Sequence, residues 1–414
     1  MPGHLSNVQS TGTHSPAAMR VVLAPDSFKG SLDAAEVCAA MAGGIRRVVP
    51  GAEIRAIPMA DGGEGTTAAL VSATGGWFQT VSVCGPMPEV RARVEAQIGW
   101  LGEDRAVLEM ASACGLPLVR PEQRNPLHTT SFGMGELIAA ALNAGAHHLI
   151  LGIGGSATND LGAGMAQALG VRFLGSDSQP ILEPLCGGGL KEVAALDLSG
   201  LHPGLASCRL DVACDVDNPL LGPHGATAVY GPQKGATPTI AAELEEGLAH
   251  LIELLEETTG RRVRDRPGAG AAGGMGAMMM ALTDGAFRPG IDLVLAASGF
   301  GAALEGADLV LTGEGRVDAQ TAYGKTISGV ARAAAAAGVP VVVIAGEIGP
   351  GASALHAIGV SSLFSLVSGP MDLATAMARS PELLADAAER VVRLVVAVGA
   401  KERPTDPTIP SEEE

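Results

Sequence analysis

Short β-branched runs alternate with Ala- and Leu-rich segments of helical length along most of this chain, and this alternation most constrains its fold. Residues 20–25 (RVVLAP) predict a buried strand, and Asp33 followed by Glu36 predicts a capping box at the start of a helix from Ala34. Residues 53–59 predict a second strand, which a helical segment follows. Strands that alternate with helices in this way form a parallel sheet covered by helices. We therefore expect an α/β protein.

The pattern changes near Thr80, where three short strands follow one another on tight turns. Strands joined by short turns pair antiparallel, so a second architecture begins there. The alternation then resumes, and the last third of the chain returns to buried strands with helical crossovers. We expect residues 19–80 and 288–400 to share one doubly wound sheet, with residues 81–287 inserted as a second domain.

The charge balance excludes several classes of partner. The chain carries 27 basic and 44 acidic side chains, a net charge of −17, whereas nucleic-acid binding needs an excess of Lys and Arg. Aromatic residues make up only 3% of the chain, which argues against stacking platforms for bases. No apolar run reaches the ~18 residues of a membrane-spanning helix. We therefore expect neither a nucleic-acid nor a membrane partner.

Cysteine usage and the two ends of the chain indicate the compartment. The six cysteines include no CxxC pair, which favours reduced thiols in a cytoplasmic protein. Residues 1–18 are polar and lack the basic start and apolar run of a secretory signal. We expect these residues and the Pro- and Glu-rich residues 401–414 to be disordered.

Three Gly-rich segments can be tested against known nucleotide-binding loops. Residues 268–274 fit GxGxxG but follow a polar segment rather than a strand, so the match is weak. Residues 152–157 (GIGGSA) fit GxGxxA after an apolar run, and Asp177 could then contact a ribose. A nicotinamide-dependent dehydrogenase therefore stays an alternative. Residues 323–326 (YGKT) end like a P-loop, but Ala319 stands where its first glycine is needed.

A different design recurs along the chain: a strand ends, and a Gly-rich loop with carboxylates or hydroxyls follows. Ligands bind at the carboxyl ends of parallel strands, and glycine lets backbone N–H groups approach an anion. Carboxylates beside such loops suit Mg²⁺, and phosphoryl transfer needs mainly alignment and charge neutralisation. The loops are 26–31 (DSFKGS), 60–66 (ADGGEGT), 154–160 (GGSATND), 214–219 (CDVDNP) and 312–321 (TGEGRVDAQT).

Each loop also has a purely structural interpretation. Asp before a helix is usually an N-cap. For Asp26 and Asp160 the sequence therefore allows two interpretations, a helix cap or a residue of the functional site. Asp61 and Glu64 favour a site, because two carboxylates among three glycines repel each other unless a cation or ligand is near. Lys29 could be an ordinary surface lysine.

These loops, in this order, resemble the type 1 glycerate kinase family. The resemblance covers roughly residues 19–393. It implies ATP- and Mg²⁺-dependent phosphorylation of D-glycerate, with 2-phosphoglycerate as the product. It also implies two α/β domains, a Rossmann-like one built from both chain ends and an inserted mixed-sheet one, with the active cleft between them. The matching segments are 24–32, 58–66, 152–160, 162–165, 214–222, 230–236, 268–277, 309–326 and 343–346.

The chain departs from the family pattern at Leu161, where many relatives would carry glycine.

From the chemistry of the loops we expect Asp61, Glu64 and Asp215 to be catalytic, together with Lys29 and Arg316. Mg²⁺ is expected on Asp215 and Asp217. The residues expected to bind glycerate or ATP are Ser27, Gly154, Gly155, Ser156, Thr158, Asn159, Asp160, Asn218, Lys234, Glu314, Asp318 and Lys325.

Three alternatives stay open. The product could be 3-phosphoglycerate, because a small shift of glycerate exchanges the two hydroxyls. The chain could be the dehydrogenase described above, with Gly152, Gly154 and Ala157 at the pyrophosphate. It could also be a small-anion binding protein without catalysis, although so many carboxylates would oppose an anionic ligand. The expected partner is a small-molecule substrate, and a homodimer is left open.

Overall fold

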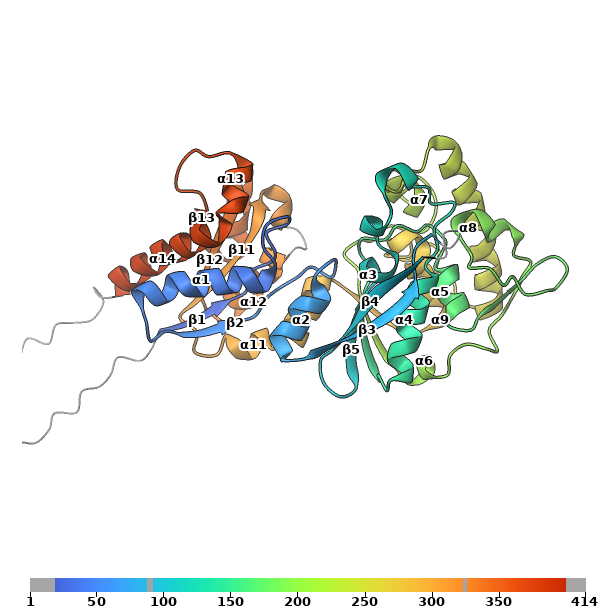
Figure 1. The fold of residues 1–414 in the computed structure, drawn as a ribbon, viewed down its shortest axis with the longest axis horizontal. Helices are drawn as coiled ribbons and strands as arrows, with labels where there is room; N and C mark the ends of the chain where they lie inside the picture. Colours follow the sequence, from blue (N-terminus) through green and yellow to red (C-terminus); the bar gives the residue numbers. More distant parts are fainter. Residues whose placement is uncertain (1–18, 88–91, 323–325, 400–414) are drawn as a thin grey trace, which may run out of the picture.

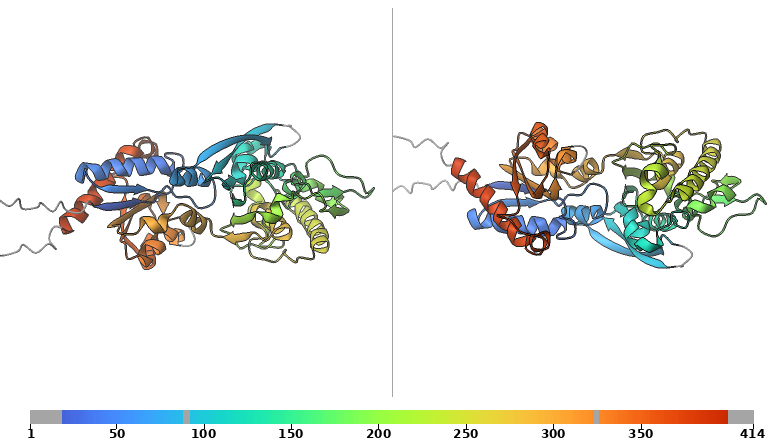
Figure 2. Two further views of the ribbon diagram at one scale, coloured as in Figure 1. Left: turned by 90° about the horizontal axis from the view of Figure 1, so that it is seen from below. Right: turned by 90° about the horizontal axis from the view of Figure 1, so that it is seen from above.

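Two β-sheets lie side by side in the molecule (Figures 1 and 2). The computed structural model describes residues 19–87, 92–322 and 326–399. The first sheet has five parallel strands in the order β13-β12-β11-β1-β2, so both ends of the chain contribute to it. Its strands are β1 (Arg20–Leu23), β2 (Glu53–Ala56), β11 (Leu309–Val317), β12 (Val341–Ile348) and β13 (Val360–Ser365).

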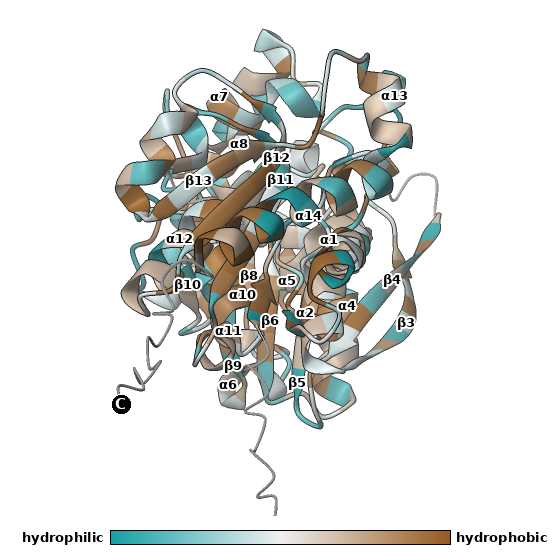
Figure 3. Cartoon of the chain, turned by 90° about the vertical axis from the view of Figure 1, so that its left-hand side faces the viewer, coloured by the Kyte–Doolittle hydropathy of each residue, from teal (hydrophilic) through white to brown (hydrophobic). Residues whose placement is uncertain are grey.

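Helices cover both faces of this sheet, as the doubly wound pattern requires. Val21 and Leu23 pack with α1 (Ala34–Val48) and α14 (Ser380–Gly399). Val22 and Val310 belong instead to the cluster of α10 (Gly290–Ala297), α11 (Phe300–Ala303) and α12 (Thr326–Ala336). The apolar strands β11 and β12 stand out between the helices in Figure 3. The expected capping box at Asp33 is present at the start of α1.

The second sheet has six strands and mixed pairing, in the order β10-β9-β6-β5-β4-β3. The three strands expected after the change of pattern pair antiparallel, and the others pair parallel. The expected α/β class, with one parallel and one mixed sheet, is therefore confirmed. The strands are β3 (Trp77–Cys84), β4 (Arg93–Trp100), β5 (Arg105–Glu109), β6 (His148–Gly152), β9 (Arg209–Ala213) and β10 (Ala286–Arg288). A separate ribbon consists of β7 (Arg172–Leu174) and β8 (Ala195–Asp197).

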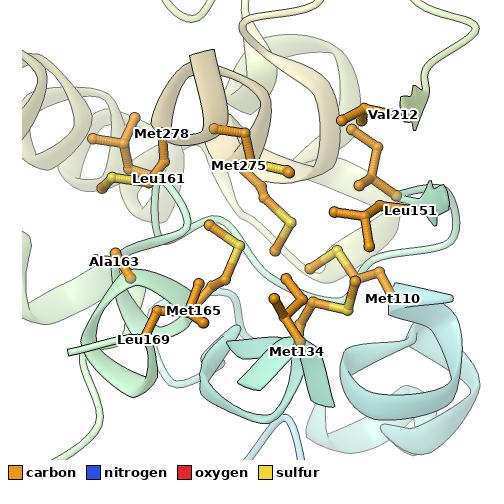
Figure 4. Packing of buried hydrophobic residues seen from close by; sticks show 14 of the residues in the cluster. Met110, Met134, Leu151, Leu161, Ala163, Met165, Leu169, Val212, Met275 and Met278 are labelled. Carbon is orange, nitrogen blue, oxygen red and sulfur yellow. The ribbon is translucent and has the colours of Figure 1, made fainter. Parts of the chain in front are cut away.

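The largest core lies on one face of the six-stranded sheet. Methionines from several helices fill it, among them Met134, Met165 and Met275 (Figure 4), because their flexible side chains adapt to irregular gaps. The helices on this side are α3 (Met110–Cys114), α4 (Phe132–Asn143), α5 (Ala163–Ala168), α6 (Gly204–Ser207), α7 (Ala226–Tyr230), α8 (Pro238–Thr259) and α9 (Met275–Leu282).

A shared apolar cluster joins the two sheets. Val107 and Ile150 of the six-stranded sheet pack in the same cluster as Val22 of the five-stranded one. Between them lie α10 and α2 (Thr66–Thr74), whose Leu70 is fully buried. The loop that precedes α2 is therefore held between both sheets. The residue boundaries of the two expected domains stay a prediction.

Further expectations concerned membrane-spanning helices, disulfide bonds and the two ends of the chain. None of the helices in the described ranges is long and apolar enough to cross a membrane. The six cysteines form no disulfide bond with one another. The expected extensions at 1–18 and 401–414 lie outside the described residues, as does Lys325.

Candidate functional site

Two cavities open at the carboxyl ends of the two sheets and meet at two shared residues. The first cavity, of about 680 Å³, lies at the carboxyl ends of β1, β11, β12 and β13 and is lined in part by the last residues of β11 and β12. The second cavity, of about 420 Å³, lies beyond β6 and β9. Lys29 and Asp61 line both cavities. One ligand group in each cavity could therefore reach the same lysine and the same carboxylate.

The polar wall of the first cavity comes from the loop after β1 and from the end of β11. The loop expected at residues 312–321 therefore begins later than the sequence predicted, because β11 continues to Val317 and contains Glu314 and Arg316. Sequence reasoning predicted Ser27, Glu314, Arg316 and Asp318 as site residues, and all four line this cavity. The Arg316 guanidinium lies 3.4 Å from the Asp318 carboxylate and 3.5 Å from that of Glu347. Its charge is therefore partly balanced within the protein itself.

Asp26 belongs to this wall as well, which resolves an ambiguity of the sequence. Its carboxylate accepts hydrogen bonds from the hydroxyl of Thr326 and the backbone N–H of Ser27, both at 2.6 Å. Burial raises the pKa of Asp26, and the charge of Asp61 raises it further. Asp26 begins no helix and lines the first cavity, so its carboxylate is placed to face a ligand rather than to cap a helix.

The loop with Asp61 and Glu64 approaches the second sheet very closely. Gly62 has φ +91°, and a Cβ on it would lie 2.8 Å from the Ala213 Cβ and 2.9 Å from the Gly290 Cα. Only glycine fits this approach, because other residues would be strained at this φ and would clash. The loop thereby carries Asp61 and Glu64 to the edge of the second cavity, which both residues line.

Asp215 reaches the same cavity from the end of β9. Its carboxylate accepts the backbone N–H of Gly290 at 2.9 Å. Although part of the side chain is open to solvent, the enclosing protein raises the pKa of Asp215 to about 6, and the charges of Asp61 and Asp292 add to this shift. A carboxyl group with such a pKa is mostly ionised at neutral pH and can still accept a proton.

The loop after β6 forms the opposite wall of the second cavity, and Lys234 holds it. Gly154 and Gly155 are exposed to the cavity, and Ser156 lines it. The Lys234 Nζ donates hydrogen bonds to the Ser156 Oγ at 2.9 Å and to the Thr158 carbonyl at 2.6 Å. Burial lowers the pKa of Lys234 to about 8, although the Asp160 charge acts in the opposite direction.

Three predicted residues of this loop lie behind the cavity wall. Asp160 accepts hydrogen bonds from the backbone N–H of Ser131 at 2.8 Å and from its hydroxyl at 2.7 Å. Asn159 donates to the Thr227 hydroxyl at 2.9 Å. Thr158, Asn159 and Asp160 are fully buried and line neither cavity. The hydrogen bonds of Asp160 and Asn159 therefore hold the loop in place, and none of the three side chains lines a cavity.

The loop after β9 also has some residues that line the second cavity and others that lie behind its wall. Asp217 and Asn218 line neither cavity. Asn218 donates to the His224 carbonyl at 2.8 Å and accepts the Tyr230 hydroxyl at 2.7 Å. Because Tyr230 lines the second cavity, Asn218 contributes to the site through that contact. Lys325 lies outside the described residues.

The dinucleotide interpretation of residues 152–157 lacks its required surroundings. In such folds the acidic residue follows a strand beside the one that carries the Gly-rich loop. Here β7 pairs with β8 in a separate ribbon, apart from β6. Asp177 accepts the Gln179 N–H at 3.0 Å within an exposed turn, and α5 begins only at Ala163. We therefore set the dehydrogenase alternative aside.

The carboxylates of the site suit a magnesium ion that also binds a ligand. Within the described ranges, no three His, Cys, Asp or Glu side chains form a group that could hold a metal ion. Mg²⁺ needs fewer protein ligands, because it usually keeps several waters and uses phosphate oxygens. Asp26 and Asp61 both line the first cavity, and the charge of Asp61 raises the pKa of Asp26. A divalent cation between them would relieve this repulsion.

Sequence reasoning missed Glu109 and Thr326. Glu109 is the last residue of β5, and its carboxylate accepts backbone N–H groups at the start of α2. The same pattern of an acidic residue at a strand end could have indicated it. Thr326 lies at the end of the matching segment 309–326 but is not among the predicted site residues. Its hydrogen bond to Asp26 links the start of α12 to the loop after β1.

Comparisons with known proteins agree on one family. A profile of the glycerate kinase family matches residues 21–396. A glycerate kinase from Halalkalibacterium halodurans is 50% identical over 372 residues, covering 90% of this chain and 97% of the relative. The glycerate kinase of Bacillus subtilis is 48% identical over 380 residues, with 92% and 97% covered.

A third relative and a solved structure extend the agreement. The glycerate 2-kinase of Escherichia coli is 44% identical over 351 residues, with 84% of this chain and 91% of the relative covered. A crystal structure assigned to glycerate kinase 2 from Salmonella typhimurium LT2 is 45% identical, with a TM-score of 0.83, and covers 92% of this chain and 100% of that one. The family matches nearly the whole of the described chain, and the chain therefore belongs to the glycerate kinase family.

Proposed function

We propose that this protein transfers the γ-phosphoryl group of ATP to the 2-hydroxyl of D-glycerate, with Mg²⁺ as cofactor, to give 2-phosphoglycerate. The observation that carries the proposal is the meeting of the two cavities at Lys29 and Asp61. A two-substrate transfer needs two adjacent binding spaces with charge neutralisation where they meet. The name of the Escherichia coli relative, glycerate 2-kinase, supports the choice of hydroxyl.

Asp26 and Asp61 would hold the magnesium ion, which supplies charge neutralisation for the phosphates when bound. The sequence suggested Asp215 and Asp217 for this role, but Asp217 lines neither cavity. Lys29 stands where the two cavities meet and can balance the charge of the group in transfer. Arg316 lies farther along the first cavity and can contact phosphate oxygens once it is released from its own carboxylate partners.

Asp215 is the residue we assign as general base. It lines the second cavity, and its pKa of about 6 leaves it ionised at neutral pH. In the transfer, a bond forms between the hydroxyl oxygen and the γ-phosphorus, and the bond from that phosphorus to the bridging oxygen breaks. ADP leaves, and the hydroxyl proton passes to the Asp215 carboxylate. Ser156 and the exposed Gly154 and Gly155 can orient the substrate carboxylate and hydroxyls.

The direct test incubates the protein with MgATP and D-glycerate and identifies the product by ³¹P NMR. We expect ADP and 2-phosphoglycerate. A 3-phosphoglycerate signal would move the acceptor to the other hydroxyl, and glycerate binding without ADP would favour a binding protein without catalysis.

A matched pair of variants tests the assigned carboxylates. Asp61→Asn should lower kcat by about 100-fold or more, since metal and proton-transfer groups contribute on that scale. Asp217→Asn changes a carboxylate that lines neither cavity, so it should keep near-normal turnover. Near-normal turnover of Asp61→Asn would remove Asp61 from the mechanism, whereas a comparable loss in Asp217→Asn would return Asp217 to the metal site.

Two further proposals concern location and assembly. We propose a cytoplasmic location, because ATP is supplied there and the cysteines carry no disulfide. A homodimer also stays a proposal, which sedimentation equilibrium of the purified protein would test.

A further inference from the structure

One wall of the first cavity is apolar, and although its Leu366 is also buried in the core beside α1 and α14, its Leu373 is exposed. Leu366 and Val367 follow β13, and Leu373 and Met377 come from α13 (Leu373–Ala378). Leu373 is 75% exposed, so it contributes almost no buried apolar area to the stability of the folded core. Ligand sites typically combine such apolar lining with a few placed polar groups. The polar residues of the loop after β1 and of the end of β11 line the same cavity as this wall.

We propose that this apolar wall binds the purine nucleoside of the nucleotide, and that the second cavity takes the three-carbon acid. The proposal rests on the proposed function and adds the orientation of the two substrates. Adenine needs a flat apolar contact surface, whereas glycerate has no apolar group to bury. In the second cavity, Gly154, Gly155, Ser156 and Lys234 offer hydrogen-bond donors instead. The γ-phosphoryl group then lies where the cavities meet.

The apolar wall is fixed relative to the loop that would face the phosphates. The Ser31 hydroxyl lies 2.6 Å from the Ser380 hydroxyl and 3.0 Å from the Met377 carbonyl, to which it donates. Met377 also approaches Gly30, where an added Cβ would lie 3.1 Å from the Met377 Cε. A nucleoside on α13 and phosphates along residues 26–29 would therefore contact one connected unit.

The charge of the first cavity indicates that the nucleotide binds as its magnesium complex. Among its described lining residues, carboxylates outnumber cations, since only Lys29 and Arg316 are basic. Free ATP would be repelled by this surface, whereas a bound divalent cation reverses part of the repulsion. Nucleotide affinity should therefore depend strongly on Mg²⁺.

The test places a charge on the apolar wall without disturbing the core. Leu373→Glu should raise the KM for MgATP by about tenfold and leave the KM for D-glycerate within twofold, a loss typical of one apolar anchor. The matched control is Leu182→Glu, which changes a leucine that is 85% exposed and lines neither cavity. The control should leave both KM values unchanged.

A binding measurement separates this proposal from the proposed function. The fluorescent nucleotide mant-ADP should bind in the presence of Mg²⁺, and Leu373→Glu should weaken that binding by about tenfold. Competition by magnesium tripolyphosphate, which has no nucleoside, should be equally strong in the variant and in the original protein. A Leu373→Glu variant that raises only the KM for glycerate would overturn the orientation. A protein that binds mant-ADP at this wall but forms no ADP from MgATP would contradict the proposed function alone.

Discussion

The Glu109 carboxylate accepts a hydrogen bond from the backbone N–H of Gly65 at 3.2 Å, and a second one from Thr67. Glu109 ends a strand of the six-stranded sheet, whereas Gly65 ends the loop that carries Asp61 and Glu64. The two bonds satisfy N–H groups at the start of α2 that the helix itself leaves open. This loop follows a strand of one sheet and is held by a residue of the other.

Replacing this acceptor should affect turnover. Burial raises the pKa of Glu109, and the nearby charge of Glu64 raises it further, while the two N–H donors lower it. Glu109→Gln keeps one acceptor oxygen but turns an amide N–H₂ toward the other backbone donor, so the Asp61 loop should shift. We expect kcat to fall about tenfold with little change in KM, because a small misplacement of catalytic groups is costly.

The control for this variant is Glu95→Gln, a change of an exposed glutamate on β4. It should leave both kcat and thermal stability unchanged. If Glu109→Gln lowered only the melting temperature and preserved kcat, Glu109 would be a purely structural cap.

The rate should depend on pH through two groups of the second cavity. In the proposed transfer, Asp215, with a pKa of about 6, must be ionised to accept the hydroxyl proton. Lys234, with a pKa of about 8, should be charged so that its three N–H donors can hold the loop after β6 and also reach the substrate. The profile of kcat/KM for D-glycerate at saturating MgATP should therefore be bell-shaped, rising through pH 6 and falling beyond pH 8. In Asp215→Asn the acidic limb should disappear along with most of the rate. A flat profile between pH 5 and 7 in the original protein would remove Asp215 as the base.

Asp215 should also lower stability in exchange for function. Its pKa is raised in the folded protein, so between about pH 4 and 6 the folded chain binds more protons than the unfolded chain, and stability falls as the pH rises. Above about pH 6 the carboxyl group is ionised in both states, and the loss of stability caused by its charge in the folded protein is complete. Asp215→Asn removes the charge and can still accept the Gly290 N–H. We expect a gain of about 1 kcal/mol at pH 7.5, a modest value because solvent screens the partly exposed group.

This stability gain is measured by urea unfolding without Mg²⁺. It should shrink as the pH falls from 6 and vanish below about pH 4, where the carboxyl group is neutral in both states. A gain that stays constant with pH would show that the charge of Asp215 is not its cause.

The sequence predicted the parts of the fold that depend on local pattern. Alternating strands and helices gave the parallel sheet, and the three strands on short turns gave the antiparallel part of the mixed sheet. The rule that ligands bind at the carboxyl ends of strands predicted that Asp61 and Asp215 would lie close together, and both residues line the second cavity. These features follow from periodicity and strand direction, which a sequence carries directly.

What the sequence could not predict is the direction in which a loop side chain points. Ser156 and Asp160 lie in the same polar loop, yet Ser156 lines the cavity and Asp160 faces the Ser131 donors behind it. The role of Glu109 could not be inferred from the apolar strand that it ends, because its hydrogen-bond partners are 44 and 42 positions away in the sequence. Such distinctions depend on tertiary packing that local pattern does not record.

Leu161 occupies a backbone conformation that favours glycine. Its φ is +57°, in the left-handed region, and its N–H donates to the Gly273 carbonyl at 3.1 Å. The side chain is fully buried in the core of Figure 4. The strain of this conformation costs about 1 kcal/mol, whereas loss of a buried leucine side chain costs about 2–5 kcal/mol. Burial therefore outweighs strain and keeps leucine tolerable at this position.

Two variants separate these opposing terms. Leu161→Ala removes most of the side chain but keeps the strained Cβ, while Leu161→Gly removes both. We expect urea unfolding to rank the original protein above Leu161→Gly, and Leu161→Gly above Leu161→Ala by about 1 kcal/mol. At an ordinary helical position the order of the two variants would be reversed, because glycine there is less stable than alanine. If alanine matched or exceeded glycine at position 161, the left-handed conformation would carry no strain.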